Sequence, residues 1–132
     1  MGASLVYLDR PNTTKATDMG QFKLGYKYAT SSMQGWRLAM EDAHIINDNI
    51  DGTGAGLFAI FDGHGGFEVA KFCERHFTNV LINSELYKQK KFDKALEEAF
   101  LQMDVLIQNS QAELLQIHNM YPAQMTPLKR AS

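Results

Sequence analysis

The polar groups with the clearest chemical potential follow an apolar run near the middle of the chain. Leu57–Phe61 is apolar throughout, and Asp62-Gly63-His64-Gly65-Gly66 follows it directly. A carboxylate at the end of a strand is held by a fixed backbone and can reach outward to a ligand. The Asp62 carboxylate and the Gly63 carbonyl offer the oxygen ligands that Mg²⁺ and Mn²⁺ prefer. The alternative is a turn aspartate that caps the next helix, since Asp-Gly is a common turn pair.

A second polar group precedes this turn in the sequence and consists of Arg37, Glu41 and Asp42. The planar guanidinium of Arg37 is suited to bidentate phosphate binding, although a surface ion pair with Glu41 or Asp42 is the alternative. Glu41 and Asp42 are adjacent, so in an extended backbone their side chains point to opposite sides. One of them can then hydrogen-bond water on a metal ion while the other supports the strands. The alternative is an ordinary solvated acidic pair.

The imidazole of His64 lies between glycines in the turn that follows Asp62. Because imidazole titrates near neutral pH, it can protonate a leaving alkoxide as a general acid. The alternative is a histidine near a helix N-terminus with no role in chemistry. Together the two segments supply a guanidinium, three carboxylates and an imidazole, the groups of a metal-dependent phosphatase. Two cations about 4 Å apart at Asp62 would hold a bridging hydroxide for in-line attack on phosphorus.

Strands are predicted before these groups and helices after them. Residues 8–25 are polar with little periodicity and are expected to form an irregular lead-in. Strand-like segments are Tyr26–Met33, Ala43–Ile46 and Leu57–Phe61, with a bend or bulge at Gln34-Gly35-Trp36 and a hairpin loop over Asn47–Gly56. The unbroken apolar character of Leu57–Phe61 predicts burial on both of its faces.

Two amphipathic helices are predicted after Gly66. Apolar residues recur at helical spacing from Val69 to Val80, and Asn83-Ser84 ends that pattern. The second pattern begins near Asp93, expected as its N-cap, and continues to about Met120 before Pro122. The order of strands and then helices indicates an α+β fold in which the helices cover one face of a sheet. Nothing in the sequence remains to cover the other face, so the fold is expected to be incomplete at Ser132.

Composition narrows the class of protein. A chain of 132 residues forms one domain at most, or part of one. Its formal net charge of −2 gives no electrostatic case for nucleic acid or an anionic membrane. The one cysteine, Cys73, excludes an internal disulfide and fits a reducing compartment. No apolar run approaches the length of a transmembrane segment, and no secretory signal is present at the start. A cytoplasmic or nuclear location is therefore expected.

The first residues nearly match the pattern for N-myristoylation of Gly2. Val6 stands where that pattern has serine or threonine. Two interpretations remain open: a myristoylated Gly2, which would give weak membrane association, and an unmodified flexible start, which the mismatch favours.

Three stretches of this sequence closely resemble the start of the metal-dependent protein serine/threonine phosphatases of the protein phosphatase 2C (PP2C) type. They are Ser31–Arg37, Met40–His44 and Phe61–Gly66, in the family's order and separation. The resemblance implies a central β-sandwich flanked by pairs of helices, an α-β-β-α arrangement of which this chain is the first part. It divides the chain into a lead-in (1–24), the N-terminal portion of the domain (25–121) and a loose tail (122–132). Some family members with a similar start are myristoylated there.

The same resemblance implies a role for each polar residue of the two segments. Arg37 would hold the substrate phosphate, and His64 would be the general acid. Asp62 would bridge two Mn²⁺ or Mg²⁺ ions, and the Gly63 carbonyl would bind one of them. Glu41 would act through metal-bound water. Asp42 would also act through water, or would hydrogen-bond to the groups that bind the ions. The bridging hydroxide would attack phosphoserine or phosphothreonine of a protein substrate directly, without a phosphoenzyme.

The sequence departs from the family in one respect. Family domains are considerably longer, and their later part supplies further metal-binding aspartates. After Asp62 this chain has only Asp93 and Asp104, and neither stands in such a motif. We therefore expect the N-terminal part of a PP2C-type phosphatase, present as a fragment, a truncated product or an incomplete sequence. The alternative is a catalytically inactive product that acts as a binding or regulatory fragment.

Overall fold

The structure, a computed structural model, describes residues 7–122. Gly2 and the predicted tail from residue 123 onward lie outside the described residues. In chain order the elements are β1 (Tyr7–Gln21), β2 (Lys27–Arg37), β3 (Ala43–Asn47), β4 (Leu57–Phe61), α1 (Glu68–Asn83), α2 (Glu85–Lys88), α3 (Phe92–Asn109) and α4 (Gln111–Met120). None of the helices in this described part is long and apolar enough to cross a membrane.

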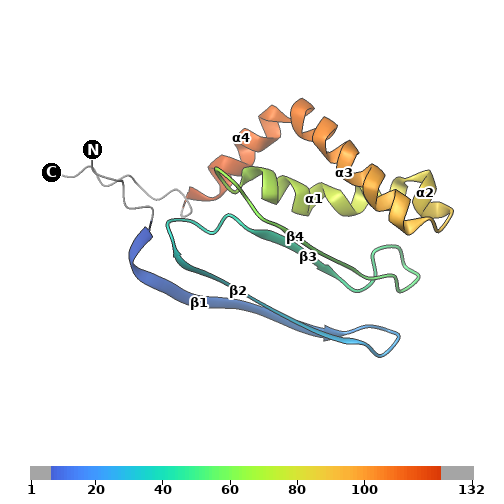
Figure 1. The fold of residues 1–132 in the computed structure, drawn as a ribbon, viewed down its shortest axis with the longest axis horizontal. Helices are drawn as coiled ribbons and strands as arrows, with labels where there is room; N and C mark the ends of the chain where they lie inside the picture. The colour runs from blue at the N-terminus through green and yellow to red at the C-terminus, as the bar shows by residue number, and fades with distance from the viewer. Residues whose placement is uncertain (1–6, 123–132) are drawn as a thin grey trace.

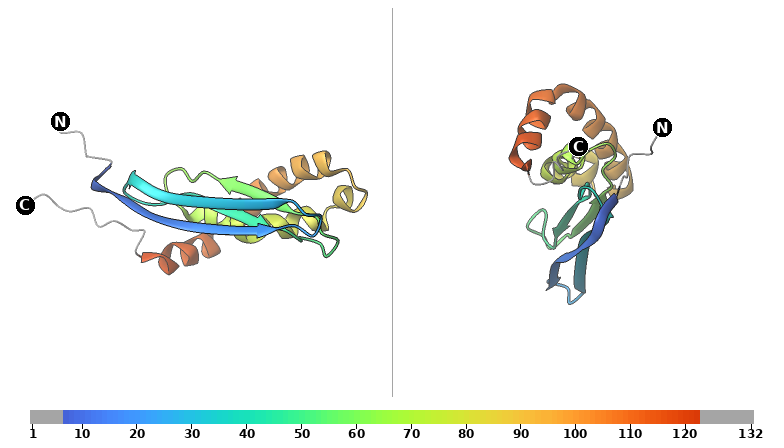
Figure 2. Two further views of the ribbon diagram at one scale, coloured as in Figure 1. Left: turned by 90° about the horizontal axis from the view of Figure 1, so that it is seen from below. Right: turned by 90° about the vertical axis from the view of Figure 1, so that its left-hand side faces the viewer.

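The four strands form two small sheets that lie in separate layers. β1 pairs antiparallel with β2, and β3 pairs antiparallel with β4. Figure 1 shows the β3–β4 sheet between the helices and the long β1–β2 hairpin, and the views in Figure 2 agree with this layering. The predicted mixed α and β fold is confirmed, with the helices on one face of the β3–β4 sheet.

The core lies between the β3–β4 sheet and the helices. Alternate residues of β4, namely Leu57, Ala59 and Phe61, pack toward the helices, and the ring of Phe61 meets Phe77 of α1 at 5.7 Å. Burial of such apolar side chains is the main stabilising contribution. The buried residues of this core are Ile45, Phe67, Phe72, Phe77, Leu81, Ala95, Ala99, Met103 and Ile117.

The prediction of an irregular lead-in over residues 8–25 is wrong, because Tyr7–Gln21 forms strand β1. Most of its side chains are exposed on both faces of the hairpin, so the sequence carries no alternation of apolar and polar residues. The strand exists because its backbone pairs with β2 along its length. Gln21 faces Lys27 next to the turn, and Tyr7 faces Arg37 at the other end. Contacts between residues distant in the sequence determine this element, and local propensity does not.

The prediction that Leu57–Phe61 is buried on both faces is wrong as well. Ile60 is 79% exposed and Phe58 is 47% exposed. The β1–β2 hairpin covers only one end of the sheet, where Phe22, Tyr28 and Phe58 meet edge to face with ring centroids 5.3–5.7 Å apart. Beyond this contact an open apolar space of about 600 Å³ separates the sheets.

The predicted second helix is divided in the structure. α3 ends at Asn109, Ser110 has φ −118° and ψ 32°, and α4 then runs in a new direction against α1. Two cross-helix pairs join α4 to α1: His76 to Glu113 at 2.7 Å and His118 to Glu68 at 2.6 Å. The expected N-cap at Asp93 is also wrong, because α3 begins at Phe92 and Asp93 lies in its first turn. A negative charge there still interacts favourably with the helix N-terminus.

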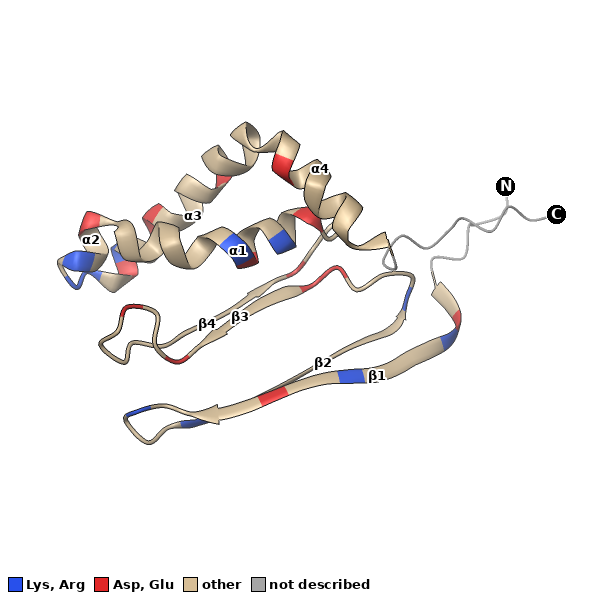
Figure 3. Ribbon diagram, turned by 180° about the vertical axis from the view of Figure 1, so that it is seen from behind, with Lys and Arg blue, Asp and Glu red and all other residues tan. Residues whose placement is uncertain are grey.

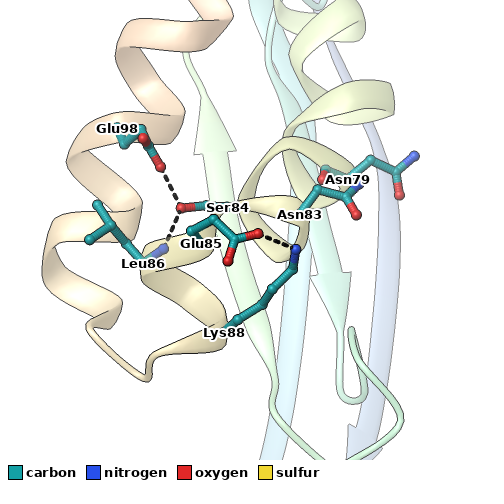
Figure 4. Close-up of polar contacts among 7 residues, drawn as sticks. All are labelled: Asn79, Asn83, Ser84, Glu85, Leu86, Lys88 and Glu98. Carbon is teal, nitrogen blue, oxygen red and sulfur yellow. Dashed lines mark hydrogen bonds and ion pairs between the residues drawn. The ribbon is translucent and has the colours of Figure 1, made fainter.

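A buried serine holds the junction of α1 and α2 against α3. The Ser84 hydroxyl, 8% exposed, donates a hydrogen bond to Glu98 of α3 and accepts one from the Leu86 backbone N–H at 3.1 Å (Figure 4). Because both contacts come from one side chain, the start of α2 is fixed to α3.

Candidate active site

The pairing of β3 with β4 brings the predicted acidic residues to one edge of the sheet. Ala43 pairs with Phe61 at the last position of the ladder. Asp42 precedes Ala43 and Asp62 follows Phe61, so the two aspartates stand at the next facing positions. Directly facing residues of antiparallel strands lie about 5 Å apart. The hairpin register thus places Asp42 and Asp62 at the same end of the sheet.

Gly63 is packed directly against the backbone of the loop between β2 and β3. A Cβ atom at this position would lie 2.3 Å from the carbonyl oxygen of Glu41 and 2.9 Å from its carbonyl carbon. Only glycine allows this approach, because the nearest atoms belong to the backbone and cannot rotate away. The contact holds the segment that carries Glu41 against the end of β4.

These segments line one open cleft of about 420 Å³. All six residues predicted from the two polar segments line it, together with four neighbours: Met33, Gln34, Arg37, Ala39, Met40, Glu41, Asp42, Asp62, Gly63 and His64. In Figure 3 the acidic residues of the β2–β3 connection and of the end of β4 lie on the same side of the molecule. The structure therefore brings together residues that are separated in the sequence by the hairpin loop.

Arg37 and Glu41 form the one ion pair of the described cleft residues. The Arg37 guanidinium lies 3.4 Å from a Glu41 carboxylate oxygen, and the Arg37 side chain is 61% exposed. Such an exposed pair contributes at most about 1 kcal/mol. The guanidinium is therefore available to an anion that enters the cleft.

The aspartates at the sheet edge fit a hard cation. Within residues 7–122 the side chains of Asp42 and Asp62 have no hydrogen-bond or ion-pair partner, and both residues are exposed. A divalent cation at this edge of the sheet would supply the counter-charge that both carboxylates lack within the described residues. The Gly63 carbonyl and the Glu41 carboxylate add oxygen donors of the type that Mg²⁺ and Mn²⁺ prefer. No three His, Cys, Asp or Glu side chains of the described part, however, form a group that could hold a metal ion.

Sequence reasoning missed Gln34 and Asn12 near this cleft. Gln34 lines it and donates a hydrogen bond to the Arg37 carbonyl at 2.8 Å, and Asn12 of β1 donates one to Gln34 at 3.2 Å. The sequence indicates only a bend or bulge around Gln34. It carries no signal for Asn12, because that contact depends on the pairing of β1 with β2.

Comparison with known proteins identifies relatives over most of the chain. The sequence model described as "Protein phosphatase 2C" matches residues 26–120. Probable protein phosphatase 2C 5 of Paramecium tetraurelia is 50% identical over 102 residues, which are 77% of this chain and 34% of that protein. Protein phosphatase 2C 1 of Paramecium tetraurelia is 48% identical over 101 residues, 76% of this chain and 33% of that protein.

A mammalian relative extends the match. Protein phosphatase 1G of Homo sapiens is 41% identical over 121 residues, which are 89% of this chain and 21% of that protein. The chain thus spans about a third of the length of the Paramecium relatives and less of the human one.

Proposed function

This chain belongs to the protein phosphatase 2C family, and we propose that it carries the N-terminal part of a site that hydrolyses phosphoserine and phosphothreonine in proteins. The observation that supports this proposal is the cleft in which Arg37, Glu41, Asp42, Asp62, Gly63 and His64 meet. It combines an exposed guanidinium for a phosphate with the carboxylates of Asp42 and Asp62, which have no partner within residues 7–122, for a cation.

Two side chains act on the phosphate ester in this proposal. The Arg37 guanidinium donates hydrogen bonds to the phosphate oxygens and orients the phosphorus for attack. His64, exposed at the end of β4, donates a proton to the oxygen of the leaving serine or threonine. Both side chains border the cleft from different segments, so Arg37 would hold the phosphate on one side and His64 would protonate the leaving oxygen on the other.

Four residues would hold two Mn²⁺ or Mg²⁺ ions in this proposal, some of them through water. Asp62 would contribute its carboxylate and Gly63 its carbonyl, while Glu41 and Asp42 would accept hydrogen bonds from water around the ions. When bound, such cations supply an activated water and neutralise charge on the phosphate. The close contact of Gly63 with Glu41 keeps these donors at a fixed separation.

A second candidate function is a binding or regulatory role without catalysis. It is favoured by the lack, within residues 7–122, of three side chains placed to hold a metal ion. In this role the cleft would bind a phosphorylated segment through Arg37 without hydrolysing it.

Substrates and location are further parts of the proposal. The substrates are proteins phosphorylated on serine or threonine, and the location is the cytoplasm or the nucleus. A myristoylated Gly2 would add weak association with membranes.

Hydrolysis of a phosphothreonine peptide by a complete family domain that begins with this chain separates these candidates, since the chain by itself carries only the N-terminal part of the proposed site. We would assay it with Mn²⁺, with EDTA, and with the variants Asp62→Asn and Asp93→Asn. The phosphatase role predicts hydrolysis that needs the cation, is lost in Asp62→Asn and persists in Asp93→Asn, whose carboxylate lies in α3 and does not line the cleft. Hydrolysis that persists in Asp62→Asn would contradict the assignment of the site. Binding of the peptide without any hydrolysis would favour the regulatory role.

A further inference from the structure

Two side-chain amides connect the backbone of β1 to the backbone of Arg37. Asn12 Nδ2 donates to Gln34 Oε1 at 3.2 Å, and Gln34 Nε2 donates to the Arg37 carbonyl oxygen at 2.8 Å. At the other end, the Thr14 backbone N–H donates to Asn12 Oδ1 at 3.1 Å. Because an N–H can only donate and a carbonyl can only accept, the two backbone ends determine the orientation of both amides. We refer to Asn12 and Gln34 as the amide relay.

The relay lies where the pairing of β1 with β2 is irregular. Asn12 pairs with Gly35, and the register shifts on both sides of Asn12. Gly35 has φ 69°, a left-handed conformation that glycine adopts without strain. Bulges of this kind redirect side chains and occur often next to active sites. The direction in which β2 leaves this irregularity decides where Arg37, two residues later, is placed.

The Arg37 side chain has little else to hold it. Its guanidinium pairs with Glu41 at 3.4 Å, in an exposed setting. A weak exposed pair cannot define the position of a long side chain, because holding it costs conformational entropy. The Arg37 backbone, in contrast, is tied to β1 in two ways, through its ladder pairing with Tyr7 and through the relay.

We propose that the amide relay of Asn12 and Gln34 positions Arg37 for phosphate binding, an inference that rests on the function proposed above. Both are positioning residues that act through the Arg37 backbone. Asn12 lies outside residues 26–120, which match the family's sequence model. The relay therefore gives the N-terminal strand β1 a role in the affinity of the site for phosphate.

The test follows inorganic phosphate binding to the isotope-labelled 132-residue chain by the NMR resonance of the Arg37 Nε–H group. Asn12→Asp keeps the shape of the side chain and removes its donor. The Gln34 amide then turns over, so that its NH₂ group faces the new carboxylate and its carbonyl faces the Arg37 carbonyl, which opens the relay. Gln34→Met removes both relay hydrogen bonds without a change of charge. We expect phosphate affinity to fall about fivefold in each variant, because each loses the hydrogen bond to the Arg37 carbonyl that holds the Arg37 backbone.

Thr13→Asp is the matched control, since it adds the same charge at the neighbouring exposed position of β1. It should leave phosphate affinity within about twofold of the unsubstituted chain. Thermal unfolding of every variant shows whether the fold is retained, and Gln34→Met keeps the test valid if Asn12→Asp unfolds. Unchanged phosphate affinity in relay variants that still fold would overturn the positioning role of the relay and leave the proposed role of Arg37 intact. If phosphate does not move the Arg37 resonance of the unsubstituted chain, the proposed role of Arg37 fails and the relay with it.

Discussion

Replacement of Gly63 by alanine tests how closely the end of β4 is packed against the loop that carries Glu41. The new Cβ would lie 2.3 Å from the Glu41 carbonyl oxygen and 2.9 Å from both its carbonyl carbon and its Cβ. An ordinary van der Waals contact begins at 3.4 Å, so the two segments must separate by roughly 1 Å. Rotation of a side chain cannot relieve the clash with the two backbone atoms.

Two quantities should change in Gly63→Ala. The free energy of unfolding should fall by about 1–3 kcal/mol, as in other overpacked sites. The affinity for Mn²⁺ should fall about tenfold or more, because the segment with Glu41 and Asp42 moves away from Asp62. Urea unfolding gives the first quantity, and titration with Mn²⁺ followed by electron paramagnetic resonance of the free ion gives the second.

Gly52→Ala is the control for lost stability without a change in the cleft. Gly52 has φ 81° and no atom within 4 Å of its Cβ position, so alanine there causes only backbone strain of about 1–2 kcal/mol. It lies in the β3–β4 hairpin loop, at the other end of the sheet from Asp62. Its Mn²⁺ affinity should stay unchanged. Equal Mn²⁺ affinities for Gly63→Ala and Gly52→Ala would refute the claim that the contact of Gly63 with Glu41 keeps the cation-binding groups together.

Three further changes probe other parts of the structure. Ser84→Ala should lower the free energy of unfolding in urea by about 1–3 kcal/mol, because the partly buried Glu98 carboxylate loses a hydrogen-bond partner. Unchanged stability would contradict this. Hydrogen bonds from Thr53 and from Tyr87 lower the pKa of the Asp51 carboxyl from its ordinary value of 3.8 to about 2. The stabilisation from Asp51 is therefore present above about pH 4 and is lost as the pH falls toward about 2. An NMR titration should show that Thr53→Ala raises the pKa of Asp51 more than Tyr87→Phe does; the reverse order would contradict the assigned causes. Glu113→Gln should speed amide hydrogen exchange in α4 by about two- to fivefold and leave exchange in α3 unchanged, since it weakens the contact with His76. Equal exchange rates in α4 before and after the change would show that this contact does not hold the helix.

The parts of the site that sequence reasoning could predict depend on short-range patterns. Leu57–Phe61 followed by Asp-Gly indicates a strand that ends in a turn, and the hairpin loop over Asn47–Gly56 indicates the pairing of its two strands. That pairing is enough to bring Asp42 close to Asp62, and the structure places them at the same sheet edge. The chemical roles of these residues stay predictions.

The parts that sequence reasoning could not predict depend on long-range contacts. β1 is polar on both faces and is recognisable only through its pairing with β2, so the contact of Asn12 with Gln34 has no local signal. The division of the predicted second helix at Ser110 also depends on long-range contacts. Apolar periodicity continues across Ser110, and α4 turns because Ile117 is buried against α1 and because two pairs bind α4 to it.

The most direct test of the account is the mapping of Mn²⁺ on the isotope-labelled 132-residue chain by paramagnetic broadening of its amide resonances. The account predicts that Asp42, Asp62 and Gly63 broaden first at low Mn²⁺, and that Asp62→Asn abolishes this pattern. Amides of the β3–β4 hairpin loop and of α3 should stay sharp under the same conditions. Broadening centred elsewhere, or an unchanged pattern in Asp62→Asn, would contradict the claim that Asp62 holds a divalent cation in this cleft.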